Sequence, residues 1–501
     1  MRLTDLLEPR ADDATTPAVY FRDRVLTRDA LRAGARSLAD RLLAAGLTPG
    51  QPVAVMLPNG PEVIAAMFGC WLAGGVYVPI NSRLTTAEVA HMTDAVQPAI
   101  VVTTTALADG FADLPMIAAN QLSWDEPTGP GRAVAAHDGD IGLVQWTSGT
   151  TGRPKPVLMR HSGFLALLEP VLAKLTGRSG EQLARRKEPM PNLIPTSLAL
   201  SAGIFNVLFA FRISAPVVVL DGFDPQNFAE VIARFGIRST VLPPAAMTTL
   251  VDAPEITSLA PLAYVRSITA PLSPLQARRF RAKFGIAVLN CYGQTEIGGE
   301  IVGWNAGDAR SFGDSKLGAV GRPHEGVTLR IVDADGADLG SDELGQLLVR
   351  TPATSAGYAD GSGLGDRVTA DGWFRTGDMG RVDAEGFLWI EGRVSDMINR
   401  GGLKVFPAEV EEVLRLSPLV ADCAVVGVPD ERLGQVPWAF VVTPVADPPE
   451  PDLSILRVFA RERLSPYKIP VRFVAVEALP RNEIGKVLTK QLVAVATDVE
   501  S

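Results

Sequence analysis

Apolar positions along the chain follow two alternating patterns, which predict two kinds of element. Short runs rich in β-branched residues predict strands, and longer stretches whose apolar positions recur every three or four residues predict amphipathic helices. The strands are expected at residues 53–57, 76–80, 99–103, 217–220, 240–242 and 287–289. The helices are expected at residues 28–45, 61–72, 86–95, 225–235 and 274–284. Strands that alternate with helices favour an α/β fold of mostly parallel, doubly wound sheets.

Two of the expected helices carry a recognisable start. Asp224 precedes Pro225, and Ser273 precedes Pro274. Asp and Ser side chains accept hydrogen bonds from the free N–H groups of a first turn, and the fixed φ of proline suits the first helical position. Both helices are therefore expected to begin at these prolines.

The pattern changes near residue 327. The runs at 327–333, 346–350 and 387–391 predict strands separated by Asp-Gly turns. Strands without intervening helices are typical of antiparallel sheets, so this part is expected to be a barrel-like subdomain of the large domain.

A second change follows at residue 392, where helices and strands alternate again over about a hundred residues, enough for a separate small domain. We expect a large N-terminal domain over residues 1–391, a hinge at 393–396 and a small mobile α+β domain over 392–501. The Pro-rich segment 444–451 predicts a surface loop. The helices of the small domain are expected at 408–415 and 453–464, and its strands at 421–428, 439–443 and 471–476.

Composition narrows the class of protein. Of the 501 residues, 47% are hydrophobic and 21% charged, which is typical of a folded protein, and the net charge of −9 argues against a duplex nucleic-acid binder. The longest apolar stretch, 203–211, is broken by Arg212 and is too short to span a membrane. The three cysteines are far apart, which disfavours a disulfide or zinc framework. We expect a soluble cytoplasmic enzyme; the oligomeric state is not readable.

The most informative segment is 143–155, where an apolar strand runs into a loop dense in glycine and hydroxyl side chains. Glycines let backbone N–H groups approach anionic oxygens closely, and the final lysine supplies a mobile charge suited to phosphate. It is not a Walker A loop, because Pro156 follows the lysine. A plain surface loop is the alternative. The expected phosphate contacts are Thr147, Ser148, Gly149, Thr150, Thr151, Gly152 and Lys155.

This segment resembles the phosphate loop of the adenylate-forming superfamily, which includes acyl-CoA synthetases, peptide-synthetase adenylation domains and beetle luciferases. The resemblance implies activation of an organic acid with ATP and Mg²⁺, and a small domain that rotates against a large one. Four further motifs occur in the order that the family has, so the resemblance spans residues 147–486.

The second motif is the segment 290–296. The resemblance implies that Tyr292 stacks on adenine, Thr295 contacts phosphate and Glu296 helps to hold Mg²⁺. The last role suits the ion, because Mg²⁺ prefers carboxylate and phosphate oxygens.

The third and fourth motifs surround the expected hinge. Asp378 matches a residue that accepts hydrogen bonds from the ribose hydroxyls, and a carboxylate can accept from both. Arg393 matches an arginine that contacts the nucleotide. Ser395 stands at the pivot, where the family usually has Asp or Lys.

The fifth motif, 479–486, ends at Lys486, which matches the catalytic lysine of the small domain. The implied reaction has two steps. The carboxylate of the acid attacks the α-phosphorus of ATP and pyrophosphate leaves; the acyl group then passes to the thiol of coenzyme A. Lys486, Mg²⁺ and the loop 147–155 would stabilise the charge of the first step. Gly401 and Gly402 would face the thiol.

The expected acid pocket departs from the family pattern. No histidine occurs in 189–216, where the family has a gating Pro-x-x-His, and Ile268 replaces a glycine of the pocket wall, which shortens the cavity. Glu300 stands where the family has a small or apolar residue; if it faces the pocket it could bind an amino or hydroxyl group. The pocket residues are Leu198, Ile268, Gly293 and Glu300, with Thr269 and Ala270 beside the nucleotide.

These departures favour a compact acid, either short or a polar or amine-bearing aromatic one; a medium-chain fatty acid is the alternative. Other acceptors stay open, namely a carrier-protein phosphopantetheine, or an aromatic amine with an oxyanion such as nitrite attacking ATP. A further alternative is that the protein is not an enzyme but a nucleotide-binding regulator with the same fold.

Overall fold

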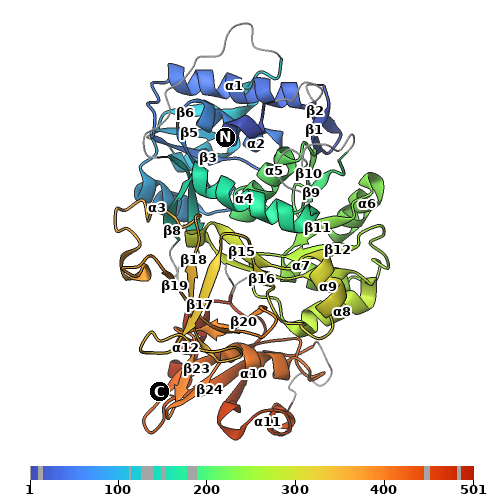
Figure 1. The fold of residues 1–501 in the computed structure, drawn as a ribbon, viewed down its shortest axis with the longest axis vertical. Coiled ribbons are helices and arrows are strands. Elements are labelled where there is room, and N and C mark those ends of the chain that lie inside the picture. The colour runs from blue at the N-terminus through green and yellow to red at the C-terminus, as the bar shows by residue number, and fades with distance from the viewer. Residues whose placement is uncertain are drawn as a thin grey trace.

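The computed structural model describes residues 2–8, 15–111, 114–125, 140–147, 154–177, 189–444, 452–481 and 487–500. Figure 1 shows an α/β molecule that runs from the N-terminal sheet at the top to a small C-terminal domain at the foot. The expected α/β class is confirmed. Within the described ranges, no helix has the length and apolarity needed to cross a bilayer. Short 3₁₀ turns occur at Leu3–Leu6, Thr105–Phe111, Ala119–Gln121, Thr295–Ile297, Gly365–Arg367 and Pro466–Lys468.

The first sheet has six strands in the order β6-β5-β3-β4-β7-β8, with β7 and β8 antiparallel and the other pairs parallel. Successive residues of β3 face opposite sides: Val53 and Val55 pack with α1 and α2, while Ala54 and Met56 pack with α3. Helices therefore cover both faces. The elements are α1 (Arg28–Ala44), β3 (Pro52–Met56), α2 (Pro61–Leu72), β4 (Val76–Pro79), α3 (Thr86–Val96), β5 (Ile100–Thr103), β6 (Met116–Ala118), β7 (Ile141–Thr147) and β8 (Lys155–Arg160).

Two smaller sheets continue the α/β part, in the orders β2-β1-β10-β9 and β11-β12-β13. Thr240 Oγ1 donates to Leu193 O at 2.9 Å and so links the two sheets. Their strands are β1 (Pro17–Phe21), β2 (Arg24–Thr27), β9 (Asn192–Ile194), β10 (Val217–Val219), β11 (Ser239–Leu242), β12 (Tyr264–Ser267) and β13 (Ala287–Leu289). The helices between them are α4 (His161–Thr176), α5 (Ser201–Arg212), α6 (Pro225–Phe235), α7 (Pro244–Asp252) and α8 (Pro274–Phe284).

The two predicted helix starts are confirmed. The Asp224 side chain accepts from Asn227 N at 2.8 Å, and Ser273 Oγ accepts from Gln276 N at 3.1 Å. In each case the proline occupies the first helical position.

The region after β13 is antiparallel and forms two sheets in the orders β14-β15-β16 and β17-β18-β19-β20. The second sheet lies in the part expected to be antiparallel, whereas the first precedes it. The helix α9 (Ala306–Phe312) lies between β15 and β16 in sequence. The strands are β14 (Cys291–Gln294), β15 (Gly299–Gly303), β16 (Arg322–Pro323), β17 (Thr328–Val332), β18 (Gly345–Arg350), β19 (Phe374–Val382) and β20 (Leu388–Arg393).

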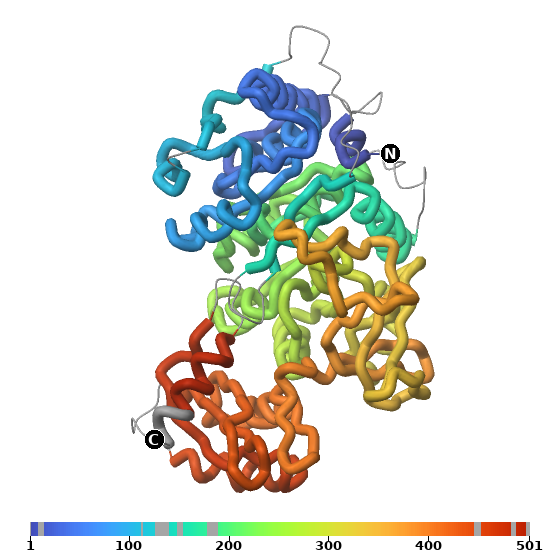
Figure 2. The backbone as a smooth tube through the Cα atoms, turned by 90° about the vertical axis from the view of Figure 1, so that its left-hand side faces the viewer, coloured from blue at the N-terminus to red at the C-terminus, as the bar shows by residue number. Residues whose placement is uncertain are grey.

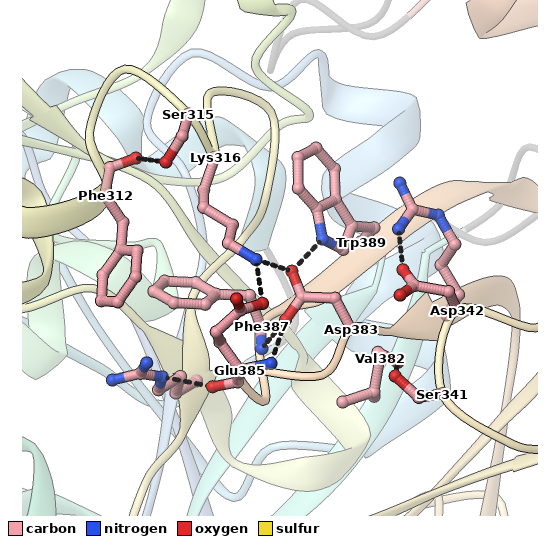
Figure 3. Close-up of polar contacts among 12 residues, drawn as sticks. Phe312, Ser315, Lys316, Ser341, Asp342, Val382, Asp383, Glu385, Phe387 and Trp389 are labelled. Atoms are coloured by element: carbon pink, nitrogen blue, oxygen red, sulfur yellow. Dashed lines mark hydrogen bonds and ion pairs between the residues drawn. The ribbon is translucent and has the colours of Figure 1, made fainter.

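A buried polar cluster fixes the turn between β19 and β20 (Figure 3). Asp383 accepts from Lys316 Nζ at 2.7 Å, from Trp389 Nε1 at 2.9 Å and from Phe387 N at 2.9 Å. Burial opposes ionisation, but these donors hold the pKa of Asp383 below its usual value. The turn matters because its two strands carry Asp378 and Arg393 into the site described below.

The small domain is a five-stranded sheet in which β22-β21-β24-β23 are antiparallel and β25 joins β24 in parallel. Figure 2 shows it in orange and red at the end of the molecule opposite the N-terminal sheet. β20 continues to Arg393, so its last two residues extend past the boundary predicted at 391. The elements are β21 (Ile398–Arg400), β22 (Leu403–Val405), α10 (Pro407–Leu414), β23 (Asp422–Asp430), β24 (Gly434–Val442), α11 (Ser454–Arg461), β25 (Arg472–Ala475) and α12 (Thr489–Glu500).

Candidate active site

A long cleft lies between the α/β part, the antiparallel part and the small domain. Motifs that are far apart in the sequence meet along its walls. The predicted residues that line it are Thr147, Lys155, Ile268, Thr269, Ala270, Tyr292, Gly293, Thr295, Glu296, Glu300, Asp378, Arg393 and Ser395. Ser148, Gly149, Thr150, Thr151, Gly152 and Lys486 lie outside the described residues.

Asp378 is the centre of a hydrogen-bond network on one wall. Its side chain is buried and accepts from Tyr292 Oη at 2.6 Å and from Gln294 Nε2 at 2.7 Å. Arg393 Nε lies 3.2 Å from Asp378 Oδ1, since the two residues are paired across β19 and β20. Burial and the nearby carboxylate raise the pKa of Tyr292 well above its usual value, so the phenol stays a donor. A carboxylate held in this way offers acceptor oxygens at a fixed place in the cleft.

Glu296 is held by two residues that its own motif does not contain. Arg367 Nη1 and Tyr358 Oη, the latter at 3.2 Å, both donate to Glu296 Oε1. Lys155 Nζ lies 5.4 Å from the centre of the Tyr358 ring, so the end of the phosphate loop and Glu296 share a neighbour. Arg367 was not predicted, because it follows a Gly-rich segment without a recognisable motif.

Gly293 is required by the close approach of β14 and β15. A Cβ at this position would lie 1.6 Å from Gly299 O. Any side chain there would separate the two strands, so the residue keeps Glu296 and Glu300 at the cleft rather than contacting a substrate through a side chain.

Glu300 has two protein partners on the cleft wall. Arg266 Nη2 forms an ion pair with Oε2, and His324 Nε2 lies 3.1 Å from Oε1. Burial alone would raise the pKa of Glu300, but Arg266 and His324 lower it to about 2. Arg266 and His324 were not predicted as site residues. The available signal for Arg266 was a charged residue within the short strand Tyr264–Ser267, directly before the expected pocket wall.

Leu198 does not belong to the cleft wall of the described residues, which corrects its assignment to the pocket. It is 3% exposed and packs in the core of the first sheet with Val63 and Ile204. Asn59 Oδ1 accepts from Leu198 N at 2.9 Å and turns this loop inward. The cleft is reached two residues later by Leu200.

Ser201 and Gln145 form a polar pair at the cleft. Ser201 Oγ donates to Gln145 Oε1 at 2.7 Å. Gln145 Nε2 is buried and has no hydrogen-bond partner among the described residues.

The small domain contributes the remaining wall. Arg481 and Val487 form an isolated antiparallel bridge and both line the cleft; in sequence they flank the segment that ends at Lys486. At the expected hinge, Ser395 is exposed and its Oγ donates to Asp396 Oδ1 at 2.9 Å.

Comparison with known proteins agrees with this geometry. Residues 9–359 match the family model "AMP-binding enzyme", and residues 409–486 match "AMP-binding enzyme C-terminal domain". The chain therefore belongs to the AMP-binding enzyme family and is an AMP-forming ligase.

Three known proteins illustrate what the chain is similar to within this family. It is 32% identical to an indoleacetate–CoA ligase of Aromatoleum aromaticum, with 96% of each chain covered. It is 31% identical to the fatty acid–[acyl-carrier-protein] ligase ScoC of Streptomyces coeruleorubidus, with 96% of this chain and 93% of that one covered. The crystal structure of ATP-bound MatB from Rhodopseudomonas palustris superposes with a TM-score of 0.87 at 26% identity, covering 100% of both chains.

Proposed function

We propose that the protein condenses a compact organic acid with ATP to an acyl-adenylate and then transfers the acyl group to the thiol of coenzyme A. The observation that carries this proposal is the convergence of Lys155, Glu296, Asp378 and Arg393 on one cleft. They come from four separate motifs, and each has a charge suited to one part of a nucleotide triphosphate and its metal ion.

In the first step, a carboxylate oxygen of the acid forms a bond to the α-phosphorus while the bond to pyrophosphate breaks. A carboxylate is already ionised at pH 7, so no general base is needed. The protein has to align the reactants and offset the growing charge on the phosphoryl oxygens. We assign that task to Lys155, the loop 147–155 and Lys486, with Asp378 accepting from the ribose hydroxyls and Tyr292 against the adenine.

Glu296 is the residue that would hold Mg²⁺. Both of its protein donors bind Oε1, which leaves Oε2 for a metal ion. Among the described residues, no group of three or more His, Cys, Asp or Glu side chains could form a complete protein cage. A single carboxylate fits an ion that usually takes its other ligands from phosphate and water. When bound, Mg²⁺ neutralises phosphate charge.

In the second step, the thiolate sulfur bonds to the acyl carbon and AMP leaves with the former anhydride oxygen. We propose that the small domain, 392–501, rotates about 393–396 between the steps, so that Gly401 and Gly402 replace the segment around Lys486. Exposed Ser395 lies at the pivot. The thiol of a carrier protein is the second candidate acceptor. The similarity to ScoC, which is named as an acyl-carrier-protein ligase, supports this candidate. An amine acceptor with an oxyanion such as nitrite is a further variant.

Pyrophosphate release from ATP, measured over a panel of short, aromatic and medium-chain acids and nitrite, tests the first step. We expect acid-dependent release that needs Mg²⁺. Addition of coenzyme A, a phosphopantetheinylated carrier protein or an aromatic amine then identifies the acceptor by its product. If no acid supports ATP–pyrophosphate exchange, the protein is a nucleotide-binding regulator instead.

A further inference from the structure

Three polar side chains with little exposure to solvent meet beside the cleft. Arg266 comes from β12, Glu300 from β15, and His324 from the segment after β16. The side chains of Arg266 and Glu300 are 12% and 11% exposed, and both residues line the cleft. Buried charges are costly unless they are paired, so a charged pair at this place indicates a purpose other than packing.

Glu300 is already occupied. Each of its oxygens has a partner, Arg266 on one side and His324 on the other. The carboxylate therefore neutralises and orients Arg266, and its charge is already compensated by this guanidinium before an ammonium group of a substrate could approach.

Arg266, in contrast, has donors to spare. Its guanidinium carries five N–H donors, and the structure gives it one partner, Glu300, through Nη2. Its other two nitrogens make no hydrogen bond to any described residue. Neither nitrogen is among the buried polar atoms that lack a hydrogen-bond partner in the described residues. Both are therefore accessible from the cleft.

The charges around Arg266 favour an electron-rich ligand. Lys174 Nζ donates to Arg322 O at 2.6 Å close to the cluster. Burial lowers the pKa of Lys174 to about 8, although Asp308 and Glu300 oppose this, so the amine is still mostly charged at pH 7. Arg322 is balanced by Asp308 at 2.8 Å. Two cations, Arg266 and Lys174, thus face one anion, Glu300.

We propose that Arg266 is a specificity-determining residue that donates hydrogen bonds to an oxygen-bearing group at the far end of the acid substrate. The substrates selected would be short acids whose distal end is a second carboxylate or a carboxamide, and acids with an apolar or ammonium end would be rejected. This inference rests on the function proposed above and names the substrate class of the same site. It replaces the expectation that Glu300 binds an amino or hydroxyl group of the substrate.

Matched acids of equal size test the inference. Succinamate, succinate and 4-methylpentanoate differ at the far end and share a backbone; 4-carbamoylbenzoate, terephthalate, 4-isopropylbenzoate and 4-(aminomethyl)benzoate form an aromatic series. In pyrophosphate release, we expect kcat/KM for the carboxamide or carboxylate member of at least one series to exceed that of its apolar isostere about tenfold or more. A hydrogen bond to a charged group supports such a ratio.

Two variants connect that ratio to Arg266. The double substitution Arg266→Leu with Glu300→Leu removes donor and counter-charge together, so no unpaired charge stays buried, and the ratio should fall to about one. Arg266→Lys keeps a charge but moves the donors, and an intermediate ratio is expected. Arg281→Leu is the matched control, because Arg281 pairs with exposed Asp314 outside the cleft lining; it should keep the wild-type ratio. Thermal melting confirms that each variant is folded.

The outcomes separate the two proposals. If no acid releases pyrophosphate, the proposed function fails and this inference fails with it. If acids are activated but apolar or ammonium-ended members match the oxygen-bearing ones, only the inference is overturned. The inference is also overturned if the double variant keeps the preference for oxygen-bearing acids, or if Arg266→Lys keeps the whole wild-type kcat/KM ratio.

Discussion

Thr269 adopts a backbone conformation that β-branched residues rarely occupy. Its φ is +70°, and among the described residues with positive φ it is the one β-branched side chain. Ala270 N donates to Ile268 O at 2.9 Å, and Thr269 Oγ1 donates to the same oxygen at 2.7 Å, which makes a tight γ-turn. The turn lies on the cleft wall, so strain is stored next to the expected adenine site.

Substitution of Thr269 by Gly should therefore stabilise the protein. The left-handed conformation costs a non-glycine residue about 1–3 kcal/mol, and glycine loses about 0.5–1 kcal/mol in backbone entropy. We expect the free energy of unfolding to rise by about 1 kcal/mol, measured by urea denaturation. Ser214→Gly, at φ +55° outside the cleft lining, is a reference for an unbranched residue and should gain less. A loss of stability in Thr269→Gly would show that the turn is unstrained.

His324 should make stability sensitive to mild acid. Burial lowers its pKa below the usual 6.5, although Glu300 pulls in the other direction. The folded state therefore binds fewer protons than the unfolded state just below pH 6.5, and stability is lost as pH falls through that region.

We expect the wild-type midpoint of thermal unfolding to fall more between pH 7.5 and pH 5 than that of His324→Gln, which can still donate to Glu300. Glu300 itself titrates lower, so this window isolates the histidine. Parallel curves for the two proteins would contradict the assignment.

At the same scale, the sequence predicted that Tyr292, Asp378 and Arg393 belong to one site because short motifs contain them, and all three line the cleft. It could not identify the partners of Glu296 and Glu300. Arg367 is 71 positions from Glu296 and Arg266 is 34 from Glu300. Such pairs depend on how strands are ordered in space, which residue spacing does not encode. Leu198 was misplaced for the same reason, since Asn59 turns its loop inward.

At the scale of elements, helices α2, α6 and α8 begin and end at the predicted residues. Each begins with proline, and for α6 and α8 the Asp or Ser before it marked the start in the sequence. The pair β14 and β15 was not predicted, because glycines interrupt its apolar pattern and its register shifts between Tyr292 and Gly293. Periodicity identifies an element only where one face is continuously buried.

The turn that joins β19 and β20 should depend on Asp383. In Asp383→Asn, one oxygen becomes an N–H₂ group that faces Lys316, Trp389 or backbone donors, and at least one buried donor is left unpaired. We expect a loss of about 2–3 kcal/mol in unfolding free energy, measured by urea denaturation. Asp342→Asn is the matched control, because its pair with Arg381 is largely exposed and should contribute less than about 1 kcal/mol. Equal losses would mean that the cluster in Figure 3 does not fix the turn.

For the whole molecule, the change of pattern at residue 392 indicated a separate small domain, and the two family matches, 9–359 and 409–486, are consistent with that division. How the small domain rests on the large one was not predictable. Among the described residues, α10 contacts β20 where the two parts meet. Burial raises the pKa of Glu412 on α10, although the charge of Arg278 on α8 opposes this.

The last prediction separates those two steps. If Lys486 stabilises the first transition state alone, Lys486→Ala should slow pyrophosphate release by several orders of magnitude. Transfer to coenzyme A from a chemically supplied acyl-adenylate should continue at near the wild-type rate, because in the proposed rotation Gly401 and Gly402, and not Lys486, face the thiol. Single-turnover assays of each step make the comparison. Lys490→Ala is the matched control: Lys490 is an exposed cleft residue four positions further along, and both steps should persist in its variant. If Lys486→Ala slowed both steps equally, the lysine would position the domain rather than act in adenylation.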